Sequence, residues 1–142
     1  MKSARFSVLV MLVLVCVIGT ACEGSTANIA SATLAKGYQD KKAVDPTTTF
    51  APTDTIHAVV EVANAPDDTK VKGVWTIVDA VDASGAAVKD AKLGETEYVT
   101  KDIGTSIDFT FQPNQPLPIG KYKAEIYLND KLDKTLEFEV VE

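Results

Sequence analysis

The chain has 142 residues and a mass of 15.2 kDa, which is room for one domain of the usual size, about 100–150 residues. It carries 14 Lys and Arg against 20 Asp and Glu, a net charge of −6. Phosphate backbones are bound by clustered Lys and Arg, so a chain this acidic is not expected to bind nucleic acid.

Residues 1–21 have the order of a secretory signal peptide. Lys2 and Arg5 give a positive start, an apolar run extends from Phe6 to Ile18, and small residues precede Cys22. The apolar run is too short for a membrane-spanning helix, which needs about 20 residues to cross roughly 30 Å of hydrocarbon. We therefore expect this segment to be removed on export.

The last residues of this segment, Gly19-Thr20-Ala21-Cys22, resemble the lipobox of bacterial lipoproteins. They depart from the family pattern at Gly19, where Leu is usual, whereas the other three fit. The resemblance implies that lipoprotein signal peptidase cuts before Cys22 and that this cysteine carries a diacylglycerol and an acylated amine, with palmitate as a typical chain. Two or more acyl chains anchor a protein stably where one does not. The alternative is an ordinary secreted protein, cut near Ala21, with a free thiol.

Removal of residues 1–21 also removes Cys16, two basic residues and no acidic ones, which leaves 12 basic and 20 acidic residues and a net charge of −8. Cys22 is then the only cysteine, so the exported domain has no internal disulfide and depends on apolar packing. We expect the protein in the cell envelope, lipid-anchored to the outer face of the plasma membrane or to the outer membrane.

Two interpretations of the segment after Cys22 stay open. Either Ala27 to Gln39 extends a polar tether, or Ile29 to Tyr38 is a first edge strand. Asp40 to Pro46 is predicted to be a charged loop. On this division, residues 22–45 hold the lipidated cysteine, the tether and the candidate edge strand, and residues 46–142 form the folded domain.

From Thr47 onward apolar residues recur at every second position, which is the period of strands half buried against a core. The expected strands are Thr55 to Val62, Lys70 to Ala80, Ser106 to Phe111, Gly120 to Leu128 and Lys131 to Val141, with weaker ones near Ala86 to Lys89 and Glu95 to Thr100. Asn129-Asp130 suits a tight hairpin because both residues tolerate positive φ. Gln112 to Pro118 contains three prolines, which cannot donate to a sheet ladder, and is predicted to be a connection.

The alternation assigns side chains to two faces. Four aromatic residues are expected in the core: Trp75, Phe109, Tyr122 and Phe138. Four other residues are expected on the outer face of the sheet that holds the third, sixth and seventh strands: Val74, Val78, Tyr127 and Val141. A mixed aromatic and aliphatic patch of this kind is a candidate surface for binding another protein, although the stems of Lys72 and Lys123 can cover it instead.

Seven or eight short strands with regularly spaced turns predict an all-β, antiparallel β-sandwich. Trp75, in the middle of its strand, resembles the core Trp of immunoglobulin-like domains, and Gly120-Lys121-Tyr122 resembles their tyrosine corner. Ala124 stands where antibody domains have cysteine, which indicates a disulfide-free member. The chain is also similar to bacterial exported lipoproteins with one such domain, over Thr47 to Phe50, Thr55 to Val62, Val71 to Trp75, Pro118 to Tyr122 and Phe138 to Val140. That family implies a fold and a location but no function.

Candidate catalytic and metal-binding residues are few. His57 is the one histidine, and strand parity puts it on the outer surface, where alone it cannot form a zinc or copper site or activate a serine. Two clusters offer oxygen ligands for calcium but lack the order of a dedicated loop: Asn64, Asp67 and Asp68, and Asn129, Asp130 and Asp133. We therefore predict no catalytic residue, metal, cofactor or small-molecule substrate.

Three functional hypotheses follow. The first is a membrane-anchored, non-catalytic module of the bacterial cell envelope that binds another envelope protein through a sheet face or loops. The second is an inhibitor or accessory subunit of an envelope enzyme, which places the Pro113 to Pro118 loop in the enzyme's cleft. The third is a purely structural envelope spacer without a specific partner.

Overall fold

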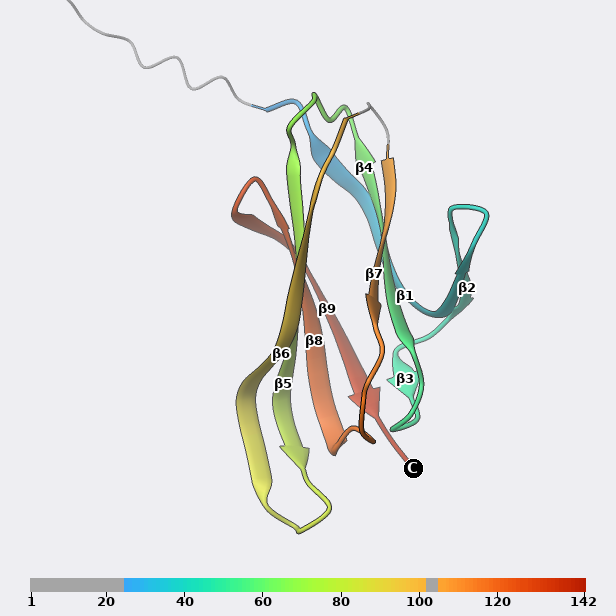
Figure 1. Ribbon diagram of the computed structural model, residues 1–142, viewed down its shortest axis with the longest axis vertical. Coiled ribbons are helices and arrows are strands. Elements are labelled where there is room, and N and C mark those ends of the chain that lie inside the picture. The colour runs from blue at the N-terminus through green and yellow to red at the C-terminus, as the bar shows by residue number, and fades with distance from the viewer. Residues whose placement is uncertain (1–24, 102–104) are drawn as a thin grey trace, which may run out of the picture.

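The computed structural model describes residues 25–101 and 105–142, in which nine strands form two packed sheets (Figure 1). The strands are β1 (Asn28–Gln39), β2 (Lys42–Pro46), β3 (Thr49–Phe50), β4 (Ile56–Ala63), β5 (Lys70–Val81), β6 (Ala87–Val99), β7 (Thr105–Phe111), β8 (Ile119–Leu128) and β9 (Lys131–Val140). The first sheet has the order β2-β1-β4-β7 and the second has the order β3-β9-β8-β5-β6. Only the two-residue β3 pairs in parallel, with β9, among these described strands. The expected all-β sandwich is confirmed. Within the described part of the chain, no helix is long and apolar enough to span a membrane.

The predicted signal peptide, the lipobox and Cys22 lie outside the described residues. Of the two interpretations of Ala27 to Gln39, the strand is correct, because β1 pairs with β4 from Asn28 to Ala35. It is not an edge strand, since β2 pairs with its other side. The sandwich therefore includes residues 28–45, which were expected to precede the folded domain.

The prediction of a loop over Asp40 to Pro46 is wrong. Asp40 and Lys41 both have positive φ, 49° and 61°, and form the turn of a β1–β2 hairpin in which Gln39 pairs with Lys42. Positive φ at both central residues gives the backbone the twist that a two-residue hairpin requires. The hairpin edge is short and ends at Pro46, which lacks a donor and so suits a sheet edge.

The two weak strands predicted over residues 86–100 are one strand, β6, of 13 residues. Asp90, at a φ of 49°, and Gly94 resemble turn formers in the sequence, but both lie within the strand. The pairing with β5 shifts between Trp75 and Thr76, so that Leu93 is an extra residue in a bulge. A bulge interrupts the alternation of faces, which explains why the pattern suggested two separate strands.

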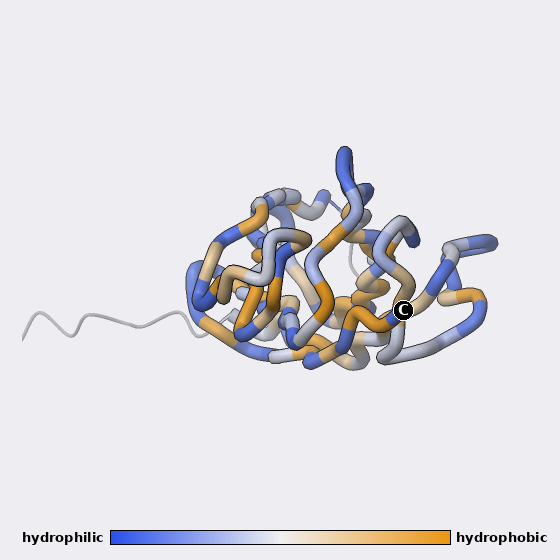
Figure 2. Tube along the Cα trace, turned by 90° about the horizontal axis from the view of Figure 1, so that it is seen from below, coloured by the Kyte–Doolittle hydropathy of each residue, from blue (hydrophilic) through white to orange (hydrophobic). Residues whose placement is uncertain are grey.

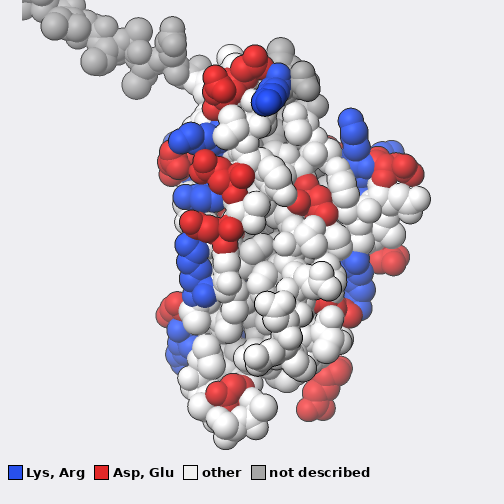
Figure 3. All heavy atoms as spheres, viewed as in Figure 1, with Lys and Arg blue, Asp and Glu red and all other residues white. Residues whose placement is uncertain are grey.

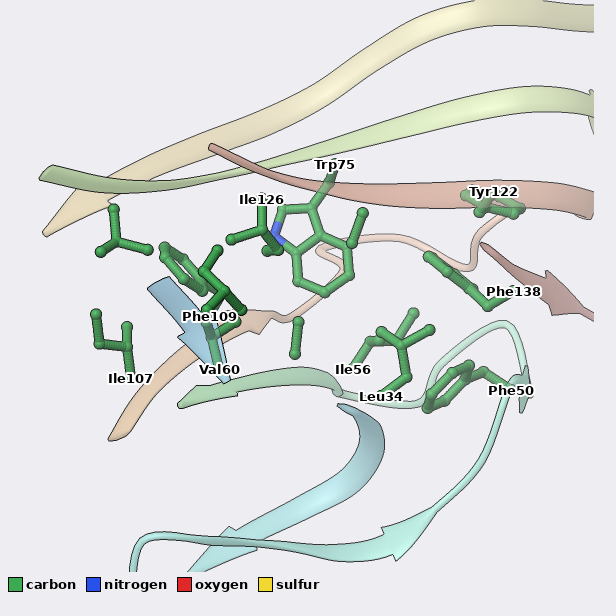
Figure 4. Close-up of a cluster of buried hydrophobic side chains, with 14 of the residues drawn as sticks. Leu34, Phe50, Ile56, Val60, Trp75, Ile107, Phe109, Tyr122, Ile126 and Phe138 are labelled. Atoms are coloured by element: carbon green, nitrogen blue, oxygen red, sulfur yellow. The ribbon is translucent and has the colours of Figure 1, made fainter. Parts of the chain in front are cut away.

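The core lies between the sheets and contains the four aromatic residues expected there (Figure 4). Trp75, Phe109, Tyr122 and Phe138 are each no more than 3% exposed. The ring of Phe138 stacks on Tyr122 at 5.3 Å and meets Trp75 edge to face at 6.1 Å, geometries that aromatic pairs prefer. A Cβ added at Gly73 would lie 2.6 Å from Phe109 Cδ1, so only glycine allows this close packing of β5 against the ring.

Candidate functional site

The two ends of the sandwich differ in the chain segments that form them. The described chain begins at Ser25, at the top of Figure 1, where Thr26 Oγ1 donates a hydrogen bond of 2.8 Å to the Asn64 carbonyl. We call this the N-terminal end. The opposite end, at the bottom of Figure 1, is formed by the connections over residues 51–55, 82–86 and 112–118. We call it the far end. Ten residue steps of β5, from Val71 to Val81, separate the two ends, which is about 33 Å.

The residues of the predicted binding face do not form one patch. Val74 and Tyr127 lie on the outer face of the second sheet, since Val74 pairs with Glu125 and Tyr127 with Lys72. Val78 lies four residues farther along β5, beside a bulge. Val141 follows the end of β9, whose Val140 pairs with Gly120, seven residues along β8 from Tyr127. That separation is about 23 Å at the usual rise of a strand.

Charged side chains cover much of the outer face between Val74 and Tyr127. Lys72 Nζ lies 5.0 Å from the centroid of the Tyr127 ring, a cation–π contact, and Lys123 Nζ donates to Glu125 Oε1 at 3.0 Å. The Glu125 carboxylate raises the pKa of Lys123, which keeps that ammonium charged. The Tyr127 ring is therefore partly shielded by Lys72, one of the two lysines expected to cover this face.

His57 projects outward from β4 as expected, but it is not a freely exposed surface residue. Its Nδ1 lies 2.8 Å from Asp108 Oδ2 on β7, and the two side chains are only 16% and 15% exposed. The β1–β2 hairpin crosses the same outer face farther along β4, near Glu61, which pairs with Ser106. Ser106 Oγ on β7 donates to the Lys41 carbonyl, and Tyr38 Oη donates to Ser106 Oγ, so the hairpin crosses the outer face of β4.

The two acidic clusters weighed as calcium ligands are built into turns. Asn129 Oδ1 accepts a hydrogen bond from the Lys70 amide, and Asn129 and Asp130 form the predicted β8–β9 hairpin with φ of 47° and 65°. Asn64 and Asp68 also have positive φ. Among the described residues, no group of three or more His, Cys, Asp and Glu side chains is arranged to hold a metal ion.

The far end carries an exposed apolar surface that was not among the candidate sites predicted from the sequence. Val81 and Ile119 are cross-strand partners at the ends of β5 and β8, and they are 51% and 39% exposed. Together with Pro116 and Pro118 they line an open hollow of about 730 Å³. Figure 2 views the molecule from this end. The signal in the sequence was two aliphatic residues next to predicted turns, but their pairing is visible only in the folded chain.

The 112–118 connection is fixed in place at this end. The Leu117 amide donates to the Pro52 carbonyl at 2.8 Å, and the Leu117 side chain is only 7% exposed. Tyr122 Oη donates to the Pro118 carbonyl at 2.6 Å, which is the contact that a tyrosine corner makes. Burial raises the pKa of Tyr122 to about 12, so the hydroxyl remains a donor at any physiological pH.

The β5–β6 turn is equally well ordered. Asp82 Oδ1 accepts hydrogen bonds from the Ser84 hydroxyl at 2.6 Å and from the amides of Ser84 and Ala86, each at 2.9 Å. The Ser84 hydroxyl and the Ala86 amide lower the pKa of the Asp82 carboxyl, because both bond to its charged form. The far end therefore holds a fixed negative charge beside its apolar surface.

Comparison with known proteins identifies the fold. No protein-family model matches the chain, and no curated protein matches it. An immunoglobulin-like protein from Pseudomonas aeruginosa superposes with a TM-score of 0.52 at 13% identity, over 81% of this chain and 96% of that one. A second structure is the alkylpurine DNA glycosylase AlkC of Pseudomonas fluorescens, solved bound to DNA containing an abasic site analog. It superposes with a TM-score of 0.50 at 16% identity, over 84% of this chain but only 31% of that one. The chain thus has an immunoglobulin-like β-sandwich fold, and at these identities the likeness extends to the fold alone.

Proposed function

We propose that this protein is a non-catalytic interaction module of the bacterial cell envelope, held at a membrane by lipid on Cys22 with its far end turned away from that membrane. The immunoglobulin-like fold supports a non-catalytic role, since such sandwiches present loops and sheet faces rather than a catalytic cleft. The location rests on the order of charge, apolar run and small residues before Cys22.

The observation that carries the orientation is the hydrogen bond from Thr26 Oγ1 to the Asn64 carbonyl, together with the pairing of Asn28 with Ala63. These contacts fix the start of the folded chain at the N-terminal end. Cys22 lies four residues before Thr26, a span of at most about 14 Å. Lipid on Cys22 would therefore keep the N-terminal end near the membrane and leave the far end about 33 Å higher, toward other envelope proteins.

Fractionation of cells that express the full chain tests the anchor. We expect Cys22→Ser to move the protein from the membrane pellet to the soluble fraction, because without the thiol no diacylglycerol can be attached. Cys16→Ser is the matched control, since Cys16 lies in the segment that is removed, and it should leave the protein in the membrane. Equal membrane retention of both variants would refute the proposal.

The inhibitor or accessory-subunit hypothesis uses the same end of the molecule, because the Pro113 to Pro118 loop lies there. The two hydrogen bonds that fix this loop, from Leu117 to Pro52 and from Tyr122 to Pro118, favour a preformed binding loop. Replacing the loop should then abolish inhibition of the enzyme it binds, while Cys22-dependent membrane attachment stays unchanged.

A further inference from the structure

We propose that the apolar surface at the far end binds a segment of another envelope protein in which apolar side chains are flanked by Lys or Arg. The surface consists of Val81, Ile119, Pro116 and Pro118, with Asp82 and Glu142 at its rim. The inference deepens the proposed function and rests on it for the direction in which this end faces. It names a surface different from the sheet face predicted from the sequence.

The geometry of the strand ends keeps this surface uncovered. Val81 pairs with Ile119 and with Ala87, and these are the last residues of the antiparallel ladders before the chain turns away. Both aliphatic side chains therefore stand side by side with no further strand residue to cover them. Val141, 37% exposed, follows β9 at the same end, where its amide bonds to the Phe50 carbonyl. An exposed aliphatic group gathered at one end, rather than scattered, is typical of an interaction site.

The surface is also preformed. The prolines restrict the backbone, and the Leu117, Tyr122 and Asp82 hydrogen bonds described above hold both loops that border the hollow. A partner that binds here would order little additional chain. Binding to such a surface loses less conformational entropy than binding to a mobile loop, so even a short segment can bind.

Charge determines which kind of partner fits. The charged residues that line the hollow are two acids, Asp82 and Glu142, and the lowest part of the face in Figure 3 shows acidic atoms without Lys or Arg atoms. The nearest ion pair on β5 and β6, Asp79 with Lys89 at 3.5 Å, already balances its own charge. Basic residues on a partner would therefore be attracted to the rim. A second copy would bring carboxylates together, and anionic lipid headgroups would be repelled.

The far end is a better docking surface than the outer face of the second sheet. There, Lys72 already lies over the Tyr127 ring, so a partner would have to displace that cation–π contact. Val81 and Ile119, by contrast, remain 51% and 39% exposed at the far end.

Selection of short peptides tests the inference. A display library of random 12-residue peptides is selected against the full chain in detergent micelles, and the dissociation constants of enriched peptides are measured by fluorescence anisotropy. The test variant is Val81→Lys, which places a cation in the surface. The matched control is Leu132→Lys, since Leu132 is similarly exposed, at 46%, but lies beside the β8–β9 hairpin at the N-terminal end.

We expect the enriched peptides to combine aliphatic or aromatic residues with an excess of Lys and Arg over the input library. Val81→Lys should weaken their binding by about tenfold or more, whereas Leu132→Lys should leave it unchanged. Enriched peptides that are neutral or acidic, or that bind both variants equally, would overturn the inference. If the parent chain forms a dimer that Val81→Lys dissociates, the inference is overturned and the occupant is a second copy. If the parent chain binds anionic vesicles and Val81→Lys abolishes that binding, the inference is overturned and the occupant is lipid. The outcome is independent of the Cys22→Ser fractionation, so either proposal can fail alone.

Discussion

Replacing Tyr122 by Phe isolates the hydroxyl that fixes the far-end loop to β8. The ring stays in place on Phe138, while the hydrogen bond to the Pro118 carbonyl is lost. Removing one partner of a buried hydrogen bond costs about 1–2 kcal/mol, so the variant should be less stable than the parent protein by that amount at pH 7.

The pKa of Tyr122 makes this difference depend on pH. Tyr122 has a pKa of about 12 in the folded protein against 10.0 for the ordinary side chain, so the neutral form is stabilised by folding. Its contribution is fully present below pH 10 and is lost as the pH rises from 10 to about 12, at about 1.4 kcal/mol per pH unit. The variant lacks the group and does not share that loss. At that rate, about one pH unit above the ordinary pKa cancels the roughly 1–2 kcal/mol that the parent gains from the hydrogen bond, so the two proteins should be equally stable near pH 11. Above that pH the variant should be the more stable protein.

Urea titrations at several pH values between 7 and 12 measure the difference, with fluorescence of the buried Trp75, the one tryptophan of the chain, as the signal. The other three tyrosines and all lysines are present in both proteins, so their titration cancels in the comparison. A difference between Tyr122→Phe and the parent that stays constant across this pH range would refute the burial argument. A variant as stable as the parent at pH 7 would refute the role of the hydrogen bond.

Three further changes test other parts of the fold. Gly73→Ala would place a Cβ 2.6 Å from Phe109 Cδ1, and urea titrations should show an unfolding free energy lower by about 1–3 kcal/mol. An unchanged unfolding free energy would contradict this. Asp54→Asn removes the carboxylate that pairs with Lys36 at 2.8 Å. Because Lys36 and the Ala51 amide lower the pKa of Asp54, the parent should have the higher unfolding free energy above about pH 4, and this difference should disappear as the pH falls below that value. A difference that persists in acid would contradict this. His57→Leu leaves Asp108 without its histidine partner and should lower the unfolding free energy by about 1–3 kcal/mol at pH 7. An unchanged urea midpoint would show that the pair contributes nothing.

Sequence patterns predicted the elements whose alternation is regular. In β4, the inward residues Ile56, Ala58, Val60 and Val62 are at most 2% exposed, as period two requires. β2 was missed because its five residues have no alternation and are ordered by pairing with β1. β6 was divided in the prediction because its bulge at Leu93 changes the side to which later residues point. Local propensity contains no information on either tertiary effect.

In the candidate site, too, the alternation pattern predicts which face a side chain lies on but not which residues become neighbours. Parity correctly placed Val74 and Tyr127 on an outer face, but it does not record position along the strand, so Val141 was grouped with residues about 23 Å away. Val81 and Ile119 are 38 positions apart in sequence and become neighbours only through the β5–β8 register. The burial of His57 had no local signal at all, since its partner Asp108 lies on β7 and reaches it only through the β4–β7 pairing.

The surfaces that remain open indicate how a partner would bind. The β1–β2 hairpin covers part of the outer face of the first sheet, and Lys72 covers the Tyr127 ring on the second. The long free edge of β6 carries Lys89, Lys92, Glu95 and Glu97. Charged side chains on an edge discourage addition of another strand. Recognition would therefore depend on side chains at the far end rather than on backbone pairing, so a peptide whose backbone amides are N-methylated at alternate positions should bind the far end as tightly as its unmodified parent.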